Sequence, residues 1–227
     1  EELNKEAHRI KVEDATESIT IGAVDSINVH VLGPLYRYLN TYSSMLKLRV
    51  RTHQSTELYS LINHKEVDIA FPQIERFVKN TKVEKFFEEP MVLIKKHDHS
   101  PPPFKPISAE DLNPKKELYI NWGAPFRIWH EKWWGNPGTS GTQVDTGELI
   151  VVYLQEPEYW AVVPVSMANH LSRIHPVSIH PLVETPPKRI CYRVQQREPS
   201  KAIEIFDECF EMVRDEIEEN MNLDLHL

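Results

Sequence analysis

Short apolar runs and amphipathic stretches alternate along the first third of the chain. Ile19–Ala23 is a mostly apolar run, and residues 46–52 (LKLRVRT) alternate apolar and charged side chains. Both patterns are typical of β-strands. Between them, residues 32–42 place apolar side chains at the spacing of a helix with one buried face: Leu32, Leu35, Tyr36 and Leu39. Pro34 then lies near the start of that helix, where its missing N–H is harmless.

The same order recurs in residues 53–71 (HQSTELYSLINHKEVDIAF). A polar turn precedes a helix with Leu58, Leu61 and Ile62 on one side, and the apolar strand Val67–Phe71 follows. We expect Ser55 or Thr56 to cap this helix, because a hydroxyl oxygen accepts from the free N–H groups of a first turn. Two successive strand–helix–strand units predict a parallel sheet covered by helices.

The remaining pattern is less regular. Glu75–Lys85 is a basic stretch without periodicity, and a Pro-rich loop after residue 96 leads to a short helix expected at Ser108–Leu112. Further strands are expected at Pro90–Lys95, Leu118–Asn121, Glu148–Tyr153, Trp160–Pro164 and Arg189–Gln195. Helices are expected at Phe126–Trp134 and in the C-terminal segment after Ser200, which is a natural N-cap.

Composition excludes several classes of protein. The 227 residues carry a formal net charge of -8 and no basic run, which disfavours direct nucleic-acid binding by this chain. No apolar run reaches the ~18 residues of a membrane span. Cys191 and Cys209 are far apart and outside any CxxC pattern, so we expect free thiols and a reducing cytoplasm. Residues 1–16 lack the apolar core of a signal peptide and begin without Met, which indicates a fragment or a processed form.

Metal and catalytic signatures are also missing. The pairs His97/His99 and His175/His180 do not have metal-ligand spacing, although the chain has 11 histidines. There is no GxSxG, GxGxxG or P-loop pattern, and nothing near Asp25 and Ser26 supplies a general base. We therefore expect no metal, no cofactor and no enzymatic activity.

Two turns are candidates for ligand binding, because in each a strand ends and a helix begins. In a parallel sheet such turns line one edge, where helix N-termini carry free N–H groups and partial positive charge. The polar side chains expected to converge there are Ser26, Asn28, Gln54, Ser55 and Thr56. The alternative is that they only cap helices.

A third turn is rich in aromatic residues. The segment 121–134 (NWGAPFRIWHEKWW) follows an expected strand and opens an expected helix. Trp122, Pro125 and Phe126 lie in the turn and are candidates for a pocket wall. The later tryptophans are better explained by packing in the core: Trp129, Trp133 and Trp134.

The order of these features resembles the effector-binding domain of LysR-type transcriptional regulators, from about Ser18 to Glu218. Five segments in the order and spacing of that family carry the resemblance: residues 19–35 (ITIGAVDSINVHVLGPL), 46–71, 86–112 (FFEEPMVLIKKHDHS followed by PISAEDL), 159–171 (YWAVVPVSMANHL) and 188–210 (KRICYRVQQREPSKAIEIFDECF).

The resemblance implies an α/β fold of two Rossmann-like lobes, similar to type 2 periplasmic binding proteins, with a ligand cleft between them and a chain that crosses twice. Residues 1–16 would be the end of a linker helix, residues 17–89 with 196–227 the first lobe, and residues 90–195 the second. The contacts to the effector would come from Ser26, from Ser55 or Thr56, from Gln73, and from Ala124, Pro125 and Phe126.

The resemblance also implies partners: a small anionic effector, other copies in a homodimer or homotetramer, and DNA only through an N-terminal winged helix-turn-helix that this chain lacks. The location would be the cytoplasm, with no membrane. Residues 156–160 (EPEYW) replace the family's usual Gly-rich segment and change the wall of the second lobe. A transport-type solute-binding protein and a hydrolase that uses Ser26 are the rival hypotheses.

Overall fold

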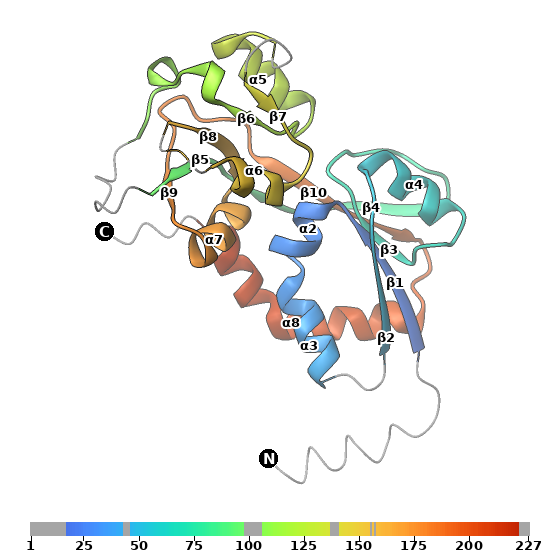
Figure 1. The fold of residues 1–227 in the computed structure, drawn as a ribbon. Helices are drawn as coiled ribbons and strands as arrows, with labels where there is room; N and C mark the ends of the chain where they lie inside the picture. The colour runs from blue at the N-terminus through green and yellow to red at the C-terminus, as the bar shows by residue number, and fades with distance from the viewer. Residues whose placement is uncertain are drawn as a thin grey trace. The chain divides into compact units, whose positions relative to one another are not determined.

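A computed structural model describes residues 17–42, 46–97, 106–136, 141–154, 156 and 158–222. The chain forms two compact units (Figure 1). Unit 1 contains Glu1–Phe86 and Tyr192–Ile217, and unit 2 contains Phe87–Cys191 and Glu218–Leu227. The expected linker helix at residues 1–16 and residues 98–105 of the Pro-rich loop lie outside the described residues. No helix in the described ranges has the length and apolar character needed to span a bilayer.

Unit 1 is built on a five-stranded sheet with the order β2-β1-β3-β10-β4. Strand β1 is parallel to both β2 and β3, and Ala23 aligns with Thr52 on one side and with Phe71 on the other. The carboxyl ends of the three strands therefore meet at one edge, as the strand–helix–strand pattern predicts. The strands are β1 (Glu17–Ala23), β2 (Leu46–Thr52), β3 (Ile69–Phe71), β4 (Thr81–Glu89) and β10 (Arg189–Gln196).

Helices α2 (Asp25–His30), α3 (Gly33–Tyr42), α4 (Ser55–Asn63) and α8 (Lys201–Met221) complete this part of the chain. Helix α4 packs closely on β1, because a Cβ at Gly22 would lie 2.7 Å from Leu58 Cδ2. Helix α8 begins after Ser200, whose Oγ accepts from the N–H of Ile203 (3.4 Å), as the sequence predicts. Cys191 on β10 and Cys209 on α8 are free thiols, also as predicted.

Unit 2 contains an antiparallel sheet with the order β8-β5-β9 and a parallel pair, β6-β7. Two clusters of buried apolar side chains pack on it, one around Val163 and Leu171 and one around Leu93 and Trp160. The elements are β5 (Met91–Lys96), β6 (Leu118–Tyr119), α5 (Ala124–Trp134), β7 (Thr142–Gln143), α6 (Gly147–Tyr153), β8 (Trp160–Pro164), α7 (Val165–Ile174) and β9 (Val177–His180), with 3-10 turns at Ala109–Asp111 and Pro114–Lys116.

Four local predictions are wrong. Glu148–Tyr153 is not a strand but part of helix α6, in which only Gly147 and Ile150 are buried. The β-branched residues of this segment therefore do not belong to a sheet. The stretch Glu75–Lys85 is not irregular throughout, because β4 begins at Thr81; its side chains are only partly buried and give little apolar signal. The short helix expected at Ser108–Leu112 is present as a 3-10 turn, but helix α2 was not predicted, because the first helix was expected only at residues 32–42. The cap of α4 is Gln54 rather than Ser55 or Thr56.

Candidate functional site

The turns that follow β1 and β2 are joined directly. The N–H of His53 donates to the carbonyl oxygen of Ala23 (3.1 Å), so the residue after β2 is bonded to the last residue of β1. Parallel pairing brings both turns to the same edge of the sheet, and this bond holds them side by side. The candidate site of unit 1 starts from this junction.

The side chain of Asn28 links the two turns by hydrogen bonds. Its Nδ2 donates to Thr52 Oγ1 (2.9 Å) and to the carbonyl oxygen of Arg51 (3.2 Å). Its Oδ1 accepts from the Tyr36 hydroxyl (2.6 Å). Burial raises the pKa of the Tyr36 phenol, so this group keeps its proton and remains a donor. The amide of Asn28, which is 6% exposed, thus has both its donor and its acceptor engaged within the protein.

The start of α4 contributes the second polar group. The Gln54 side chain accepts from the backbone of Glu57, and the Glu57 carboxylate accepts in return from the Gln54 N–H (3.2 Å), which is a reciprocal capping box. Ser55 is therefore released from capping, and its Oγ accepts from the N–H of Gln73 (3.0 Å). This bond ties the turn after β3 to the same helix. Thr56 is exposed on the surface of α4.

Ser26 lies in the first turn of α2 and is 7% exposed. With Asn28 and Ser55 it forms a set of buried or nearly buried polar side chains, none of which carries a charge. These side chains offer hydroxyl and amide groups to a ligand, while the charged groups in the first turns of α2 and α4 are Asp25 and Glu57. Among the described residues no group of three or more His, Cys, Asp or Glu is placed to hold a metal ion.

The aromatic turn belongs to unit 2. Gly123 has φ +103°, a backbone conformation that glycine adopts without strain, and it places Ala124 and Pro125 on the surface at the start of α5. Trp122 is half-buried, and its Nε1 donates to the carbonyl oxygen of Val162 (2.8 Å). Phe126 is 3% exposed and supports the turn from within the core.

Two of the three later tryptophans pack on the core as predicted. Trp129 and Trp134 lie partly buried against the cluster that contains Phe126, and Trp134 Nε1 donates to the carbonyl oxygen of Ala109 (3.0 Å). Trp133 is partly buried, and Lys132 Nζ lies 4.9 Å from the centre of its ring. Within the EPEYW segment, Trp160 is 1% exposed, and Glu158 forms a surface ion pair with Lys116.

Two buried ionisable pairs of unit 2 were not predicted from the sequence. Glu89 accepts from Arg189 Nε (2.8 Å) and from the N–H of Ser166 (2.8 Å), so one carboxylate joins β10 to the first turn of α7. Arg189 also donates to Ser166 Oγ (3.2 Å), and its guanidinium lies 5.8 Å from the centre of the Trp122 ring. The partners are 100 residues apart, and no local pattern signals such a pair.

The second pair joins Glu117 and His130, which are 1% and 0% exposed. His130 Nε2 lies 2.7 Å and 2.9 Å from the two carboxylate oxygens of Glu117. Burial raises the pKa of the Glu117 carboxyl group, and the bond to His130 counteracts this only in part. Tyr119 and Trp134 pack edge-on against the imidazole at 4.8 Å and 5.0 Å between ring centres. This pair is part of the core around α5.

Comparison with protein families gives one decisive match. The family model described as the LysR substrate binding domain matches residues 13–215 of the chain. The chain belongs to this LysR family. A comparison with curated proteins found no match.

Solved structures agree with the fold of this LysR domain. It is similar to the reduced OxyR regulatory domain of Pseudomonas aeruginosa (18% identity, TM-score 0.67, covering 88% of this chain and 97% of that one). It is also similar to the MexT regulatory domain of the same organism (16% identity, TM-score 0.70, 86% and 98%). A third relative is the BenM effector binding domain with benzoate (17% identity, TM-score 0.69, 94% and 99%).

These likenesses confirm the predicted fold class, two α/β lobes of the type found in type 2 periplasmic binding proteins. They also identify the LysR chain as an effector-sensing domain of a transcriptional regulator. The family and its relatives are regulator domains rather than enzymes. The sequence resemblance had pointed to the same family on five weak motifs taken together.

Proposed function

We propose that this domain senses a small organic anion, with a recognition site at the carboxyl edge of the unit 1 sheet. The observation that carries the proposal is the convergence of three turns there. The turn after β1 is bonded to the turn after β2 through Asn28 and Thr52, and Ser55 at the start of α4 is bonded to Gln73 after β3. Hydrogen bonding thus holds the three turns together before any ligand arrives.

The residues have different roles in this proposal. The hydroxyl groups of Ser26 and Ser55 contact the ligand, since a serine can donate to a carboxylate oxygen while its own oxygen accepts elsewhere. Asn28 is a positioning residue, because its amide is already engaged on both sides. Gln54 and Gln73 lie at the edge of the proposed site, and Thr56, which is exposed, lies outside it. In unit 2, Trp122 and the turn at Ala124 and Pro125 are the proposed contacts, with Phe126 fixing that turn.

The chemistry of the edge favours a ligand that brings its own negative charge. The polar side chains are neutral, so an anion meets no carboxylate among Ser26, Asn28 and Ser55. The helix start at Ser55 adds the partial positive charge of a helix N-terminus. The relative BenM holds benzoate in its effector binding domain, so aromatic carboxylates are the first class to test here.

The regulatory consequence follows from linkage. A ligand shifts an equilibrium only by its differential affinity for the two states. We infer that effector binding changes how homodimers or homotetramers of the full-length protein present a DNA-binding domain, in the cytoplasm, to operator DNA. The effector acts as a signal and is not converted.

The test is a thermal-shift and calorimetry screen of benzoate, substituted benzoates, short dicarboxylates and amino acids. At 100 times its Kd a ligand stabilises the folded chain by roughly 2.7 kcal/mol. Ser26→Ala and Ser55→Ala are expected to weaken a hit at least about tenfold, since a hydrogen bond to a charged group contributes about 1.5–3 kcal/mol. Ser60→Ala, at an exposed serine on the same helix α4, is the matched control.

Two results would contradict the proposal. One is a ligand whose affinity is the same in Ser26→Ala, Ser55→Ala and Ser60→Ala. The other is turnover of the ligand that is lost on Ser26→Ala, which would revive the hydrolase hypothesis.

A further inference from the structure

A surface of unit 1 formed by the chain after Gln73 exposes an aromatic side chain beside positive charge. We call it the Phe77 surface. It surrounds a cavity of about 570 Å³ and consists of Glu75, Arg76, Phe77, Thr81, Lys82, Val83 and Arg197. Phe77 is 85% exposed, and Ile74 on the same loop is 49% exposed. Two large apolar side chains exposed on one loop beside a cavity make this surface a candidate interaction site.

The loop that carries Phe77 is held in place. The Tyr59 hydroxyl donates to the carbonyl oxygen of Ile74 (2.6 Å) and accepts from the N–H of Arg76 (3.0 Å), so one buried side chain fixes both ends of this tripeptide. The Thr81 hydroxyl donates to the carbonyl oxygen of Val78 (2.8 Å). The exposure of Phe77 is therefore built into an ordered loop, so binding does not have to order the backbone on either side of it.

The charges of the surface favour an acidic partner. Lys82 forms an ion pair with Glu84 at 2.7 Å, which largely neutralises both. No carboxylate of a described residue forms an ion pair with Arg76 or Arg197. Glu75 is the one acidic residue in the lining, and a side-chain hydrogen bond links it to Tyr192. The lining thus carries more positive than negative charge, on a chain whose net charge is -8.

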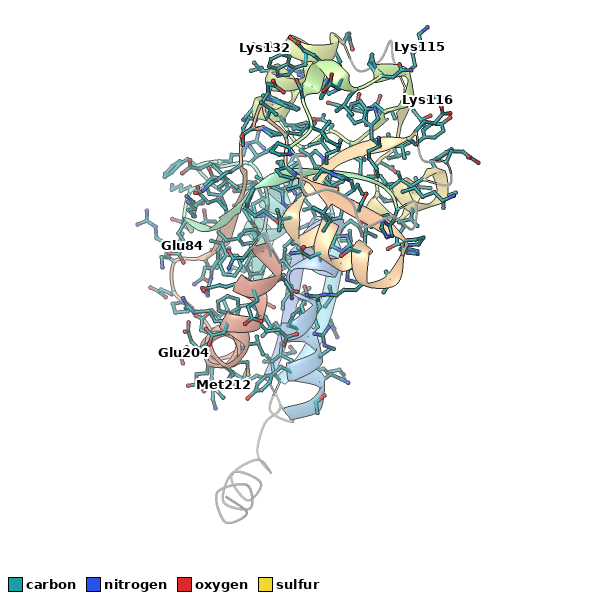
Figure 2. All side chains as sticks on the ribbon, turned by 90° about the vertical axis from the view of Figure 1, so that its left-hand side faces the viewer. Glu84, Lys115, Lys116, Lys132, Glu204 and Met212 are labelled. Carbon is teal, nitrogen blue, oxygen red and sulfur yellow. The ribbon has the colours of Figure 1, made fainter. Side chains whose placement is uncertain are left out.

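The surface lies at a sheet edge. Strand β4 is at one end of the order β2-β1-β3-β10-β4, and Thr81–Val83, its first residues, line the cavity. Edge strands present backbone N–H and C=O groups that can pair with an added strand. Figure 2 shows two acidic side chains of unit 1, Glu84 on the same strand and Glu204 on α8.

From these observations we infer that the Phe77 surface docks an extended, acidic segment of a partner protein. The segment adds to the edge of β4, its carboxylates meet Arg76 and Arg197, and an apolar side chain packs against Phe77 and Val83. Aromatic residues and arginine are the residue types that carry most of the free energy at protein interfaces. Duplex DNA is the rival anion, but a phosphate backbone would leave Phe77 without a role.

The experiment uses an array of fluorescent heptapeptides DLEXDLE, in which X is each of the twenty residues, titrated into the full chain by polarisation. Binding that prefers an apolar X is expected. N-methylation of alternate peptide bonds is expected to abolish it, because an added strand needs its N–H groups. Phe77→Ser is expected to weaken it about tenfold or more, given the cost of leaving an apolar partner in water. Arg76→Ala with Arg197→Ala is expected to weaken it by a similar factor.

Two control variants separate specific docking from non-specific peptide binding. Ile128→Ser removes a side chain that is 67% exposed in unit 2 and is expected to leave binding unchanged. The Ser26→Ala variant is likewise expected to bind the peptide normally, which keeps this result independent of the effector proposal. The inference is overturned if no peptide binds, if Phe77→Ser binds as well as the original chain, or if a labelled DNA duplex binds instead and ignores Phe77→Ser.

Discussion

The two units handle buried polar groups differently. At the carboxyl edge of the unit 1 sheet, the nearly buried side chains are Ser26, Asn28 and Ser55, which carry no charge. In unit 2 the buried polar side chains include two ionisable pairs, Glu89 with Arg189 and Glu117 with His130. The chain thus places neutral groups where we propose that a ligand binds, and paired ionisable groups inside the second core.

This difference has an energetic consequence. Removing one partner of a buried ion pair leaves an uncompensated charge and costs about 3–5 kcal/mol, whereas a neutral hydrogen bond contributes about 0.5–1.5 kcal/mol net. Unit 2 should therefore be sensitive to single charge losses, and the edge of unit 1 should tolerate substitution. A recognition surface that tolerates substitution can change its specificity without losing the fold.

The largest expected effect tests the buried charge directly. Arg189→Met should lower the free energy of unfolding by about 3–5 kcal/mol, because Glu89 loses its charged partner while it stays buried. Its neighbour Lys188 pairs with Glu88 at 2.8 Å but is exposed, so Lys188→Met should cost at most about 1 kcal/mol. Urea denaturation followed by circular dichroism measures both. Equal effects of the two variants would contradict the contrast between the units.

The second effect lies in unit 1. Asn28→Ala should cost about 1–3 kcal/mol, because the Tyr36 hydroxyl loses its acceptor and the end of β2 loses its donor. Asn40→Ala, at an exposed position on α3, is the matched control and should change stability by less than about 0.5 kcal/mol. Because Asn28 links two turns, the same variant should also weaken effector binding. A variant that keeps full stability would show that the link is dispensable.

The third effect is a pH dependence of unit 2. Burial raises the pKa of Glu117 in the folded chain above its ordinary value of about 4.3. At pH values above 4.3, the Glu117 carboxyl group is protonated in a larger fraction of folded than of unfolded molecules. The stability contributed by this group is therefore complete below 4.3 and is lost as the pH rises through the raised value, with a slope of at most about 1.4 kcal/mol per pH unit.

Glu117→Gln should remove this contribution. The measurement is the urea midpoint of the original chain and of the variant at every half pH unit from 4 to 8. As the pH rises, the original chain should lose stability relative to the variant. Glu110→Gln, at an exposed carboxylate of the same unit, is the matched control for the substitution. A constant difference for Glu117→Gln would contradict the raised pKa.

Much of the fold of unit 1 could be predicted from the sequence, because the spacing of its apolar residues indicates each strand and helix locally. The alternation in Leu46–Thr52 and the helical spacing after it need only the periods of a strand and a helix. The pair of Glu89 and Arg189 was not readable, since its members are 100 residues apart and each stands beside an ordinary apolar strand. The apolar run in Glu148–Tyr153 misled the prediction, because tertiary packing can override intrinsic strand preference.

The candidate site was readable only in part. Hydroxyl residues after a strand point to a helix start, and Ser55 is indeed the first residue of α4. Helix α2, which contains Ser26, was not predicted, because the first helix was expected at residues 32–42. The engagement of Asn28 by Tyr36 and Thr52 depends on the folded arrangement of α2, α3 and β2. Gln54 was overlooked as a cap because glutamine is not among the preferred N-cap residues.

The smallest expected effect concerns that cap. Gln54→Ala should cost about 0.5 kcal/mol, at the low end for an N-cap, because the reciprocal bond from the Gln54 backbone to Glu57 survives the substitution. Gln54→Ser should restore or exceed the original stability, since serine is a preferred cap. If Gln54→Ala instead weakens effector binding tenfold while stability hardly changes, Gln54 contacts the ligand. In that case Gln54 belongs to the proposed recognition site together with Ser26, Asn28 and Ser55.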